Sequence, residues 1–144
     1  MKNRWAKMIL SAILFAGSMF LNSCTSAVGG SACSNSDGAL SNASFVIVET
    51  PRSGQRVSSG FAVSGCSRTF ESNVNWVLKD RKGAVIASGH TSGGGVDGPG
   101  NFSTVVGYSV ASRQIGHLEV FEEDASDGEG FPPGRNVIPL VLQP

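Results

Sequence analysis

The sequence predicts an all-β protein built as a two-layer antiparallel sandwich. Short apolar runs alternate with polar residues, turn-forming glycines separate these runs, and no long stretch shows the helical period. Glycine makes up 19 of the 144 residues, enough to supply turns between many short elements. In the run NVNWVLK, Val74, Trp76 and Leu78 share one face, which is the pattern of a half-buried strand.

Seven such runs are expected to form strands, and each is bounded by turn signals. In the run HLEVFE, Leu118 and Val120 share one face and the intervening residues take the other. Pro139 interrupts the last run, and because proline has no N–H for a ladder, we expect that strand to lie at an edge or to carry a bulge there. Seven short strands with frequent turns are typical of an immunoglobulin-like sandwich. The expected strands are Phe45–Glu49, Gly60–Ser64, Asn73–Lys79, Val85–Thr91, Asn101–Val106, His117–Glu122 and Val137–Leu142.

The first 23 residues have the parts of a signal peptide that precedes a lipid-modified cysteine. Three basic residues come first, and an uncharged apolar run from Met8 to Leu21 follows, which is too short for a membrane span. The stretch LNSC, ending at Cys24, resembles the bacterial lipobox, in which the cysteine is acylated and becomes the first residue of the mature protein. We therefore expect residues 1–23 to be removed and Cys24 to carry a lipid anchor. The alternative is an ordinary signal peptide that is cut elsewhere and leaves Cys24 a plain thiol.

Residues 24–44 are small and polar, and we expect them to form a flexible tether between the anchor and one folded domain, residues 45–144. A domain of about 100 residues is large enough for its own core. The anchor predicts a cell-envelope protein, held at an outer membrane or at the extracytoplasmic face of a membrane. In a cell with two membranes, Thr25 favours the outer membrane by resemblance, since lipoproteins kept at an inner membrane often have aspartate at that position.

The charge balance excludes one class of partner. Removing the signal peptide takes three basic residues and no acidic residue, which leaves eight Lys and Arg against 11 Asp and Glu. Nucleic-acid-binding proteins carry a strongly basic face instead, so we expect no nucleic-acid partner.

Two cysteines, Cys33 and Cys66, remain once Cys24 is assigned to the lipid. Because the cell envelope can be oxidising, we expect Cys33 and Cys66 to form a disulfide. The chain enters the first expected strand at the end where the second finishes, which brings the tether and the residues after the second strand together. Two free thiols, with Cys66 buried as a small apolar residue, are the alternative.

No catalytic constellation is found in the sequence, and we expect no enzyme activity, no cofactor and no metal site. His90 and His117 fall on different expected strands, without the ligand spacing of a zinc site. The glycine-rich stretch 93–100 is followed by a strand rather than by the helix of a phosphate loop, so we expect a flexible hairpin loop. The acidic stretch 122–130 lacks the spacing of an EF-hand calcium loop, which predicts a solvated loop.

The order of several motifs resembles one known family. The segments TPRSGQRVSSGFAVSGCSRTFE, KGAVIASG, GNF, GHLEVFEEDASDG and VIPLVL follow one another as in the immunoglobulin-like domain of bacterial spore germination proteins, of the Germane-associated type. The resemblance covers residues 45–143, and its most specific parts are Gly65–Glu71 and Leu118–Gly128. Gly60 and Ser67 depart from the family's frequent proline and alanine. The resemblance implies an extracellular binding module on an envelope lipoprotein and carries over no catalytic residue.

Strands that alternate up and down sort the charged turn residues to two ends of the domain. We expect the tether to leave from an acidic end and a basic end to face away from the membrane, towards acidic wall polymer or an acidic protein. Ordinary solubilising charge is the alternative. The basic end is expected to hold Arg52, Arg56, Lys79, Arg81, Lys82 and Arg113 against Asp80, and the acidic end Glu71, Asp97, Glu122, Glu123, Asp124, Asp127 and Glu129 against Arg68 and Arg135.

These features predict a lipid-anchored binding or scaffold module of the cell envelope, without catalytic activity, whose partner is an envelope protein or a wall polymer. The residues expected to bind are Arg52, Arg56, Arg81, Lys82 and Arg113. A wall-glycan-binding domain is the alternative, although such sites offer exposed aromatic rings and only Phe121 and Phe131 are candidates. An envelope protease inhibitor that inserts the loops GGGVDGPG and GFPPGRN is a third hypothesis.

Overall fold

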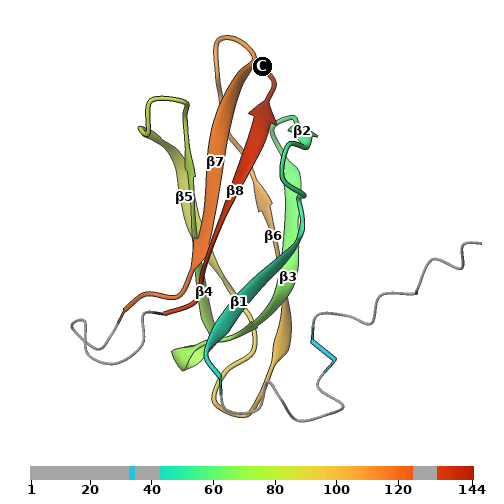
Figure 1. The fold of residues 1–144 in the computed structure, drawn as a ribbon, viewed down its shortest axis with the longest axis vertical. Helices are drawn as coiled ribbons and strands as arrows, with labels where there is room; N and C mark the ends of the chain where they lie inside the picture. Colours follow the sequence, from blue (N-terminus) through green and yellow to red (C-terminus); the bar gives the residue numbers. More distant parts are fainter. Residues whose placement is uncertain (1–32, 35–42, 125–132) are drawn as a thin grey trace, which may run out of the picture.

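A computed structural model describes residues 33–34, 43–124 and 133–144 of the chain. The described residues form two packed, largely antiparallel sheets (Figure 1). A short 3-10 turn, Phe70–Ser72, separates β3 from β4. The strands are β1 (Phe45–Thr50), β2 (Arg56–Val57), β3 (Phe61–Arg68), β4 (Asn73–Lys79), β5 (Val85–Ser92), β6 (Gly100–Val106), β7 (Gln114–Phe121) and β8 (Arg135–Leu142).

The strands divide into a three-stranded sheet, in the order β1-β3-β6, and a five-stranded sheet, in the order β2-β8-β7-β4-β5. After β1 the chain crosses to the second sheet, where β2 pairs in parallel with the end of β8. The N-terminal part of the domain therefore contributes a strand to each sheet. This two-sheet arrangement, with consecutive strands distributed between the layers, is an immunoglobulin-like β-sandwich.

The core lies between the two sheets and is filled by every second residue of the long strands. Val74, Trp76 and Leu78 of β4 are all buried, as the alternation in the sequence predicts. Each such side chain contributes about 1.5–3 kcal/mol by leaving water. The other core residues are Val46, Val57, Val63, Phe102, Val106, Leu118, Val120, Ile138, Leu140 and Leu142.

The expectation of seven strands was wrong by one, because β2 has only two residues and leaves no periodic signal. The second expected strand was also too short, since β3 continues past Ser64 to Arg68. The first three residues of this extension, Gly65 to Ser67, are small and show no alternation of apolar and polar side chains. A small residue is needed there: a Cβ on Gly65 would lie 1.9 Å from the carbonyl oxygen of Ile47 in β1. The bounds of β4 agree with those expected from the sequence.

In the described part of the chain, Pro139 lies where β8 has no neighbouring strand on one side. Strand β2 pairs only with Val141 and Leu142, and beyond them the backbone N–H of Gly54 donates to the Pro139 carbonyl at 2.8 Å. The register between β7 and β8 runs without interruption from Gln114 to Phe121, so the expected alternative of a bulge is wrong. The proline nitrogen faces the open side of the strand. Because no neighbouring strand lies there, its lack of an N–H removes no hydrogen bond from the sheet.

Side chains close both open sides of the sandwich. On one side the amide of Asn136 in β8 bonds to the backbone of β1, and on the other the Thr91 hydroxyl of β5 donates to the Ser103 carbonyl of β6 at 3.0 Å. At one end, the Tyr108 hydroxyl donates to the Val57 carbonyl at 2.6 Å and accepts from the Gln143 N–H at 3.0 Å. These bonds hold β2 and the end of β8 together.

Candidate binding surfaces

A disulfide joins Cys33 to Cys66, which are 33 positions apart in the sequence and have their Cα atoms 5.2 Å apart. Cys66 lies inside β3, the central strand of the three-stranded sheet, and not after the strand as expected. Its register partners are Ile47 in β1 and Asn101 in β6. The bond therefore attaches the segment before the domain to the middle of a sheet.

The side chain of Cys66 points away from the core. Its neighbour Gly65 faces inward, because a Cβ there would also meet the ring of Phe102, and alternate residues of a strand face opposite sides. Cys66 is nevertheless fully buried. The disulfide thus fixes Cys33 on the outer face of the three-stranded sheet, two residues from the end of β3.

The lipidation site expected at Cys24 lies outside the described residues, as do the signal peptide and most of the tether. In the part of the chain that the structure describes, there is no helix of the length and apolarity needed to cross a membrane.

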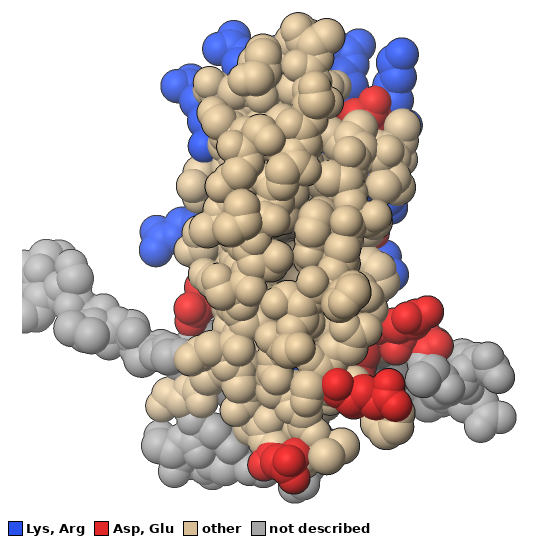
Figure 2. Space-filling model, turned by 180° about the vertical axis from the view of Figure 1, so that it is seen from behind, with Lys and Arg blue, Asp and Glu red and all other residues tan. Residues whose placement is uncertain are grey.

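The structure brings the five expected binding residues to one end of the sandwich. Arg52 and Arg56 lie in the connection from β1 to β3, Arg81 and Lys82 form the β4–β5 turn, and Arg113 directly precedes β7. All five are exposed, and within the described residues none forms an ion pair. Figure 2 shows most Lys and Arg side chains towards one end of the molecule and most Asp and Glu side chains towards the other. We call this group of five residues the basic end.

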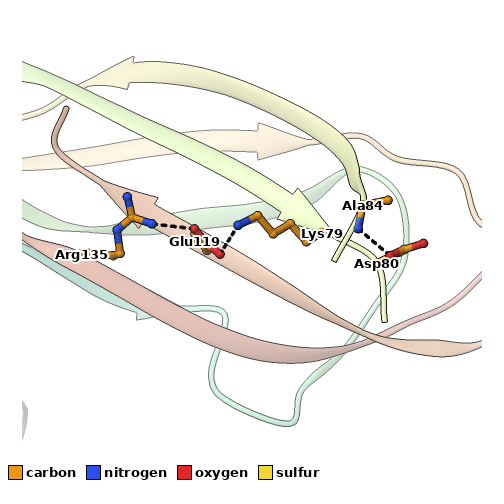
Figure 3. A network of polar contacts seen from close by, with 5 residues as sticks. All are labelled: Lys79, Asp80, Ala84, Glu119 and Arg135. Carbon is orange, nitrogen blue, oxygen red and sulfur yellow. Dashed lines mark hydrogen bonds and ion pairs between the residues drawn. The ribbon is translucent and has the colours of Figure 1, made fainter. Parts of the chain in front are cut away.

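Two other charged residues at this end are already engaged. The Asp80 carboxylate accepts from the backbone N–H groups of Lys82 at 2.8 Å and Ala84 at 2.9 Å, which closes the β4–β5 turn. Lys79 points back along the sheet, where its Nζ lies 2.6 Å from Oε1 of Glu119 (Figure 3). Arg135 approaches the other oxygen of Glu119 at 2.8 Å and covers the ring of Phe121. Lys79 therefore adds little to the basic end.

The opposite end carries the exposed carboxylates Glu71, Asp97, Glu123 and Asp124. Glu122 differs from them, since it is buried and accepts from the Ser44 hydroxyl and the Phe70 N–H. Glu122, expected as the end of a strand and the start of the acidic stretch, lies one residue past β7 and is not solvated, because its carboxylate joins the entry to β1 with the turn after β3. Asp127 and Glu129 lie outside the described residues.

The remaining candidates do not assemble into a site. His90 is exposed on β5 and His117 is half-buried on β7. Among the described residues, no three His, Cys, Asp or Glu side chains could hold a metal ion together. The stretch 93–100 forms a tight bridge between Gly95 and Gly98, with Gly94 and Gly95 buried, rather than a flexible loop.

The candidate glycan platform Phe121 has little open surface, whereas the first expected inhibitor loop exposes Val96 and Asp97. The guanidinium carbon of Arg135 lies 4.6 Å from the centre of the Phe121 ring, so this ring is not an open platform. Phe131 falls outside the described residues, as does much of the second expected inhibitor loop.

The two sheets, the buried core and the crossing from β1 to β2 define this chain as an immunoglobulin-like β-sandwich domain. It belongs to the family of immunoglobulin-like domains of bacterial spore germination, whose model matches residues 45–129. No curated protein matches the chain. Strand β8 lies beyond the matched residues, yet it supplies Ile138, Leu140 and Leu142 to the core and completes the sandwich.

Proposed function

We propose that this protein is a lipid-anchored binding module of the cell envelope, without catalytic activity, and that its basic end binds an anionic envelope partner. One observation carries the proposal. The disulfide that attaches the N-terminal segment lies close to the acidic end of the sandwich, and the five exposed cations lie at the opposite end.

The disulfide shortens the free part of the tether. Cys33 lies nine positions after the expected lipid site at Cys24, whereas Phe45, where the domain begins, lies 21 positions after it. With the flexibility that the sequence predicts for the tether, a stretch of nine residues has a root-mean-square span of about 16 Å. The end of β3 near Cys66 is therefore held close to the membrane, and the basic end is presented away from it.

The chemistry of the basic end suits a carboxylate-rich or phosphate-rich partner. Four of its five residues are arginines, whose planar guanidinium groups bond bidentately to carboxylates and phosphates. A cluster of exposed cations also attracts a polyanion over distances of several ångströms and accelerates its association at low salt. An acidic envelope protein fits these requirements, and an anionic wall polymer is the alternative.

In-cell crosslinking of the tagged full-length protein, followed by mass spectrometry of the captured material, tests the proposal. We expect one recurrent acidic protein with the native chain and its loss in the triple variant Arg52→Glu, Arg56→Glu, Arg113→Glu. The matched control reverses three exposed charges at the other end, Glu71→Lys, Asp97→Lys and Glu123→Lys, and should keep the partner. Equal capture by both variants would exclude the basic end as the binding surface. Capture of wall material alone would favour the glycan alternative, and a Cys24→Ala variant tests the anchor.

A further inference from the structure

Strand β5 is an edge strand whose outer backbone groups pair with no other strand among the described residues, although its Thr91 side chain bonds across to β6. It ends the five-stranded sheet and, within the described residues, pairs with β4 alone, and Figure 1 shows it at the outside of the sandwich. Its register is irregular near Val85, but the six residues from Ala87 to Ser92 pair regularly with Asn73–Leu78. This six-residue stretch, about 20 Å long, contains no proline, lysine or other residue that is charged at neutral pH, which are the usual protections of an edge strand.

The other sheet edges in the described part of the chain are blunted. Strand β1 is bonded to the Asn136 side chain, β8 has Pro139 and the short β2 beside it, and the Ser103 carbonyl of β6 accepts from Thr91. A free edge offers a row of backbone donors and acceptors to another strand. Strand β6 also lacks charge and proline, and what separates it from β5 is the Ser103 carbonyl, which already accepts the Thr91 hydroxyl, so β5 is the edge we choose for a further strand.

The charge distribution identifies a second copy of the chain as that partner. Arg81 and Lys82 lie just before β5, whereas Glu71 and Asp97 lie at the end where β5 finishes. When two copies pair antiparallel along β5, the basic turn of each comes to the level of the acidic end of the other. Parallel pairing would instead bring like charges together. Only the antiparallel arrangement is electrostatically favourable.

We propose that two copies of this protein pair antiparallel along β5, about a two-fold axis near Gly89, and form one continuous sheet with five strands from each copy. Opposite residues in an antiparallel pair must face the same side of the sheet, which an axis at Gly89 satisfies. Ser88 then lies opposite His90 of the second copy, and Ala87 opposite Thr91 of the second copy. No bulky side chain projects at the centre of the contact, because the axis passes through glycine.

The position of the disulfide agrees with this pairing. A two-fold axis perpendicular to the sheet keeps both three-stranded sheets on the same side of the dimer. Both Cys33–Cys66 bonds then lie on that side, since each is on the outer face of its three-stranded sheet. Two tethers leaving one face suit attachment to one membrane, and in this dimer the basic end of each copy points sideways along the membrane instead of directly away from it. The pairing engages Arg81 and Lys82 and leaves Arg52, Arg56 and Arg113 available for the envelope partner.

Thiol crosslinking of the full-length protein in its membrane tests the geometry. In the proposed pairing, the Ser88 positions of the two copies are diagonal neighbours about 7–8 Å apart. A Ser88→Cys variant treated with a short bifunctional maleimide should run as a dimer on a denaturing gel. Val137→Cys is the matched control, because it is exposed on the same outer face but lies on β8. Absence of a dimer from Ser88→Cys, or equal dimer from both variants, would overturn the proposal.

The molecular mass of the detergent-purified protein by light scattering is the second measurement. We expect a dimer for the native chain and a monomer for Ser88→Lys combined with His90→Lys, with unchanged circular dichroism. Lys82→Glu should raise the dimer dissociation constant at least about tenfold at low salt, and Asp97→Lys added to it should restore much of the loss. A native chain that is monomeric at micromolar concentration would refute the dimer, whereas it would leave the binding role of the basic end untouched.

Discussion

The side-chain amide of Asn136 is bonded to the backbone of Val46, 90 positions away in the sequence: Nδ2 donates to the Val46 carbonyl oxygen at 2.6 Å. The Oδ1 atom of the same amide accepts from the Val48 N–H at 3.2 Å. One side chain of β8 therefore bonds to β1 as a backbone peptide of a neighbouring strand would. It joins the two sheets on a side where their strands do not pair.

Replacing Asn136 by alanine should lower the free energy of unfolding by about 2–3 kcal/mol, because two half-buried backbone groups lose their partner. Asn136→Asp keeps the acceptor for Val48 but places a carboxylate against the Val46 carbonyl, so it should also destabilise. Urea unfolding followed by tryptophan fluorescence measures both variants. An Asn136→Ala variant with native stability would show that water replaces the amide at no cost.

Reduction of the Cys33–Cys66 disulfide should destabilise the domain by about 3–4 kcal/mol. The bond closes a loop of 33 positions, and opening this loop gives the unfolded chain more conformational entropy, which favours unfolding. Thermal unfolding with and without reductant measures the change. The Cys33→Ala variant is the control, because reductant should no longer alter its melting temperature. If the native protein melts at one temperature in both conditions, the bond contributes nothing to stability.

Gly65→Ala should be among the most destabilising single changes, at about 3 kcal/mol or more, because the new methyl would overlap the backbone of β1 rather than a movable side chain. Gly107→Ala is the matched control: a Cβ there would meet only the Ser59 hydroxyl, at 3.8 Å. Chemical unfolding should therefore give clearly different free energies of unfolding for the two variants. Similar stabilities would mean that β1 and β3 are not as closely paired as the structure has them.

The two ion pairs of Glu119 should contribute unequally to the stability of the folded domain. The Lys79 and Glu119 side chains are 31% and 12% exposed, whereas Arg135 is 53% exposed and more strongly screened by solvent. A double-mutant cycle of Lys79→Ala with Glu119→Gln should give a coupling of about 1 kcal/mol, and the cycle with Arg135→Ala about half that value or less. Salt at 1 M should reduce both. A larger coupling for Arg135 than for Lys79 would contradict the ranking by exposure, because the cycle cancels the separate contact of Arg135 with Phe121.

Much of the fold was predictable because it depends on short-range patterns. The alternation in NVNWVLK placed Val74, Trp76 and Leu78 in the core, and the core contains them. The charged turn residues could be sorted to two ends from the strand order alone, because successive antiparallel strands reverse direction. Neither argument could find β2, since two residues have no period, or the burial of Glu122, which depends on Ser44 and Phe70.

The sequence by itself determined the strand pattern, the core-facing side of each long strand and the separation of positive from negative charge. Only the tertiary structure decided that Cys66 points outward from the middle of a sheet, that Asn136 joins the two sheets, and that β5 keeps a free edge. The physical reason is the range of the interactions. Alternation and turn preference act between residues a few positions apart, whereas a disulfide, a side-chain bridge and a sheet edge depend on which distant strands lie side by side.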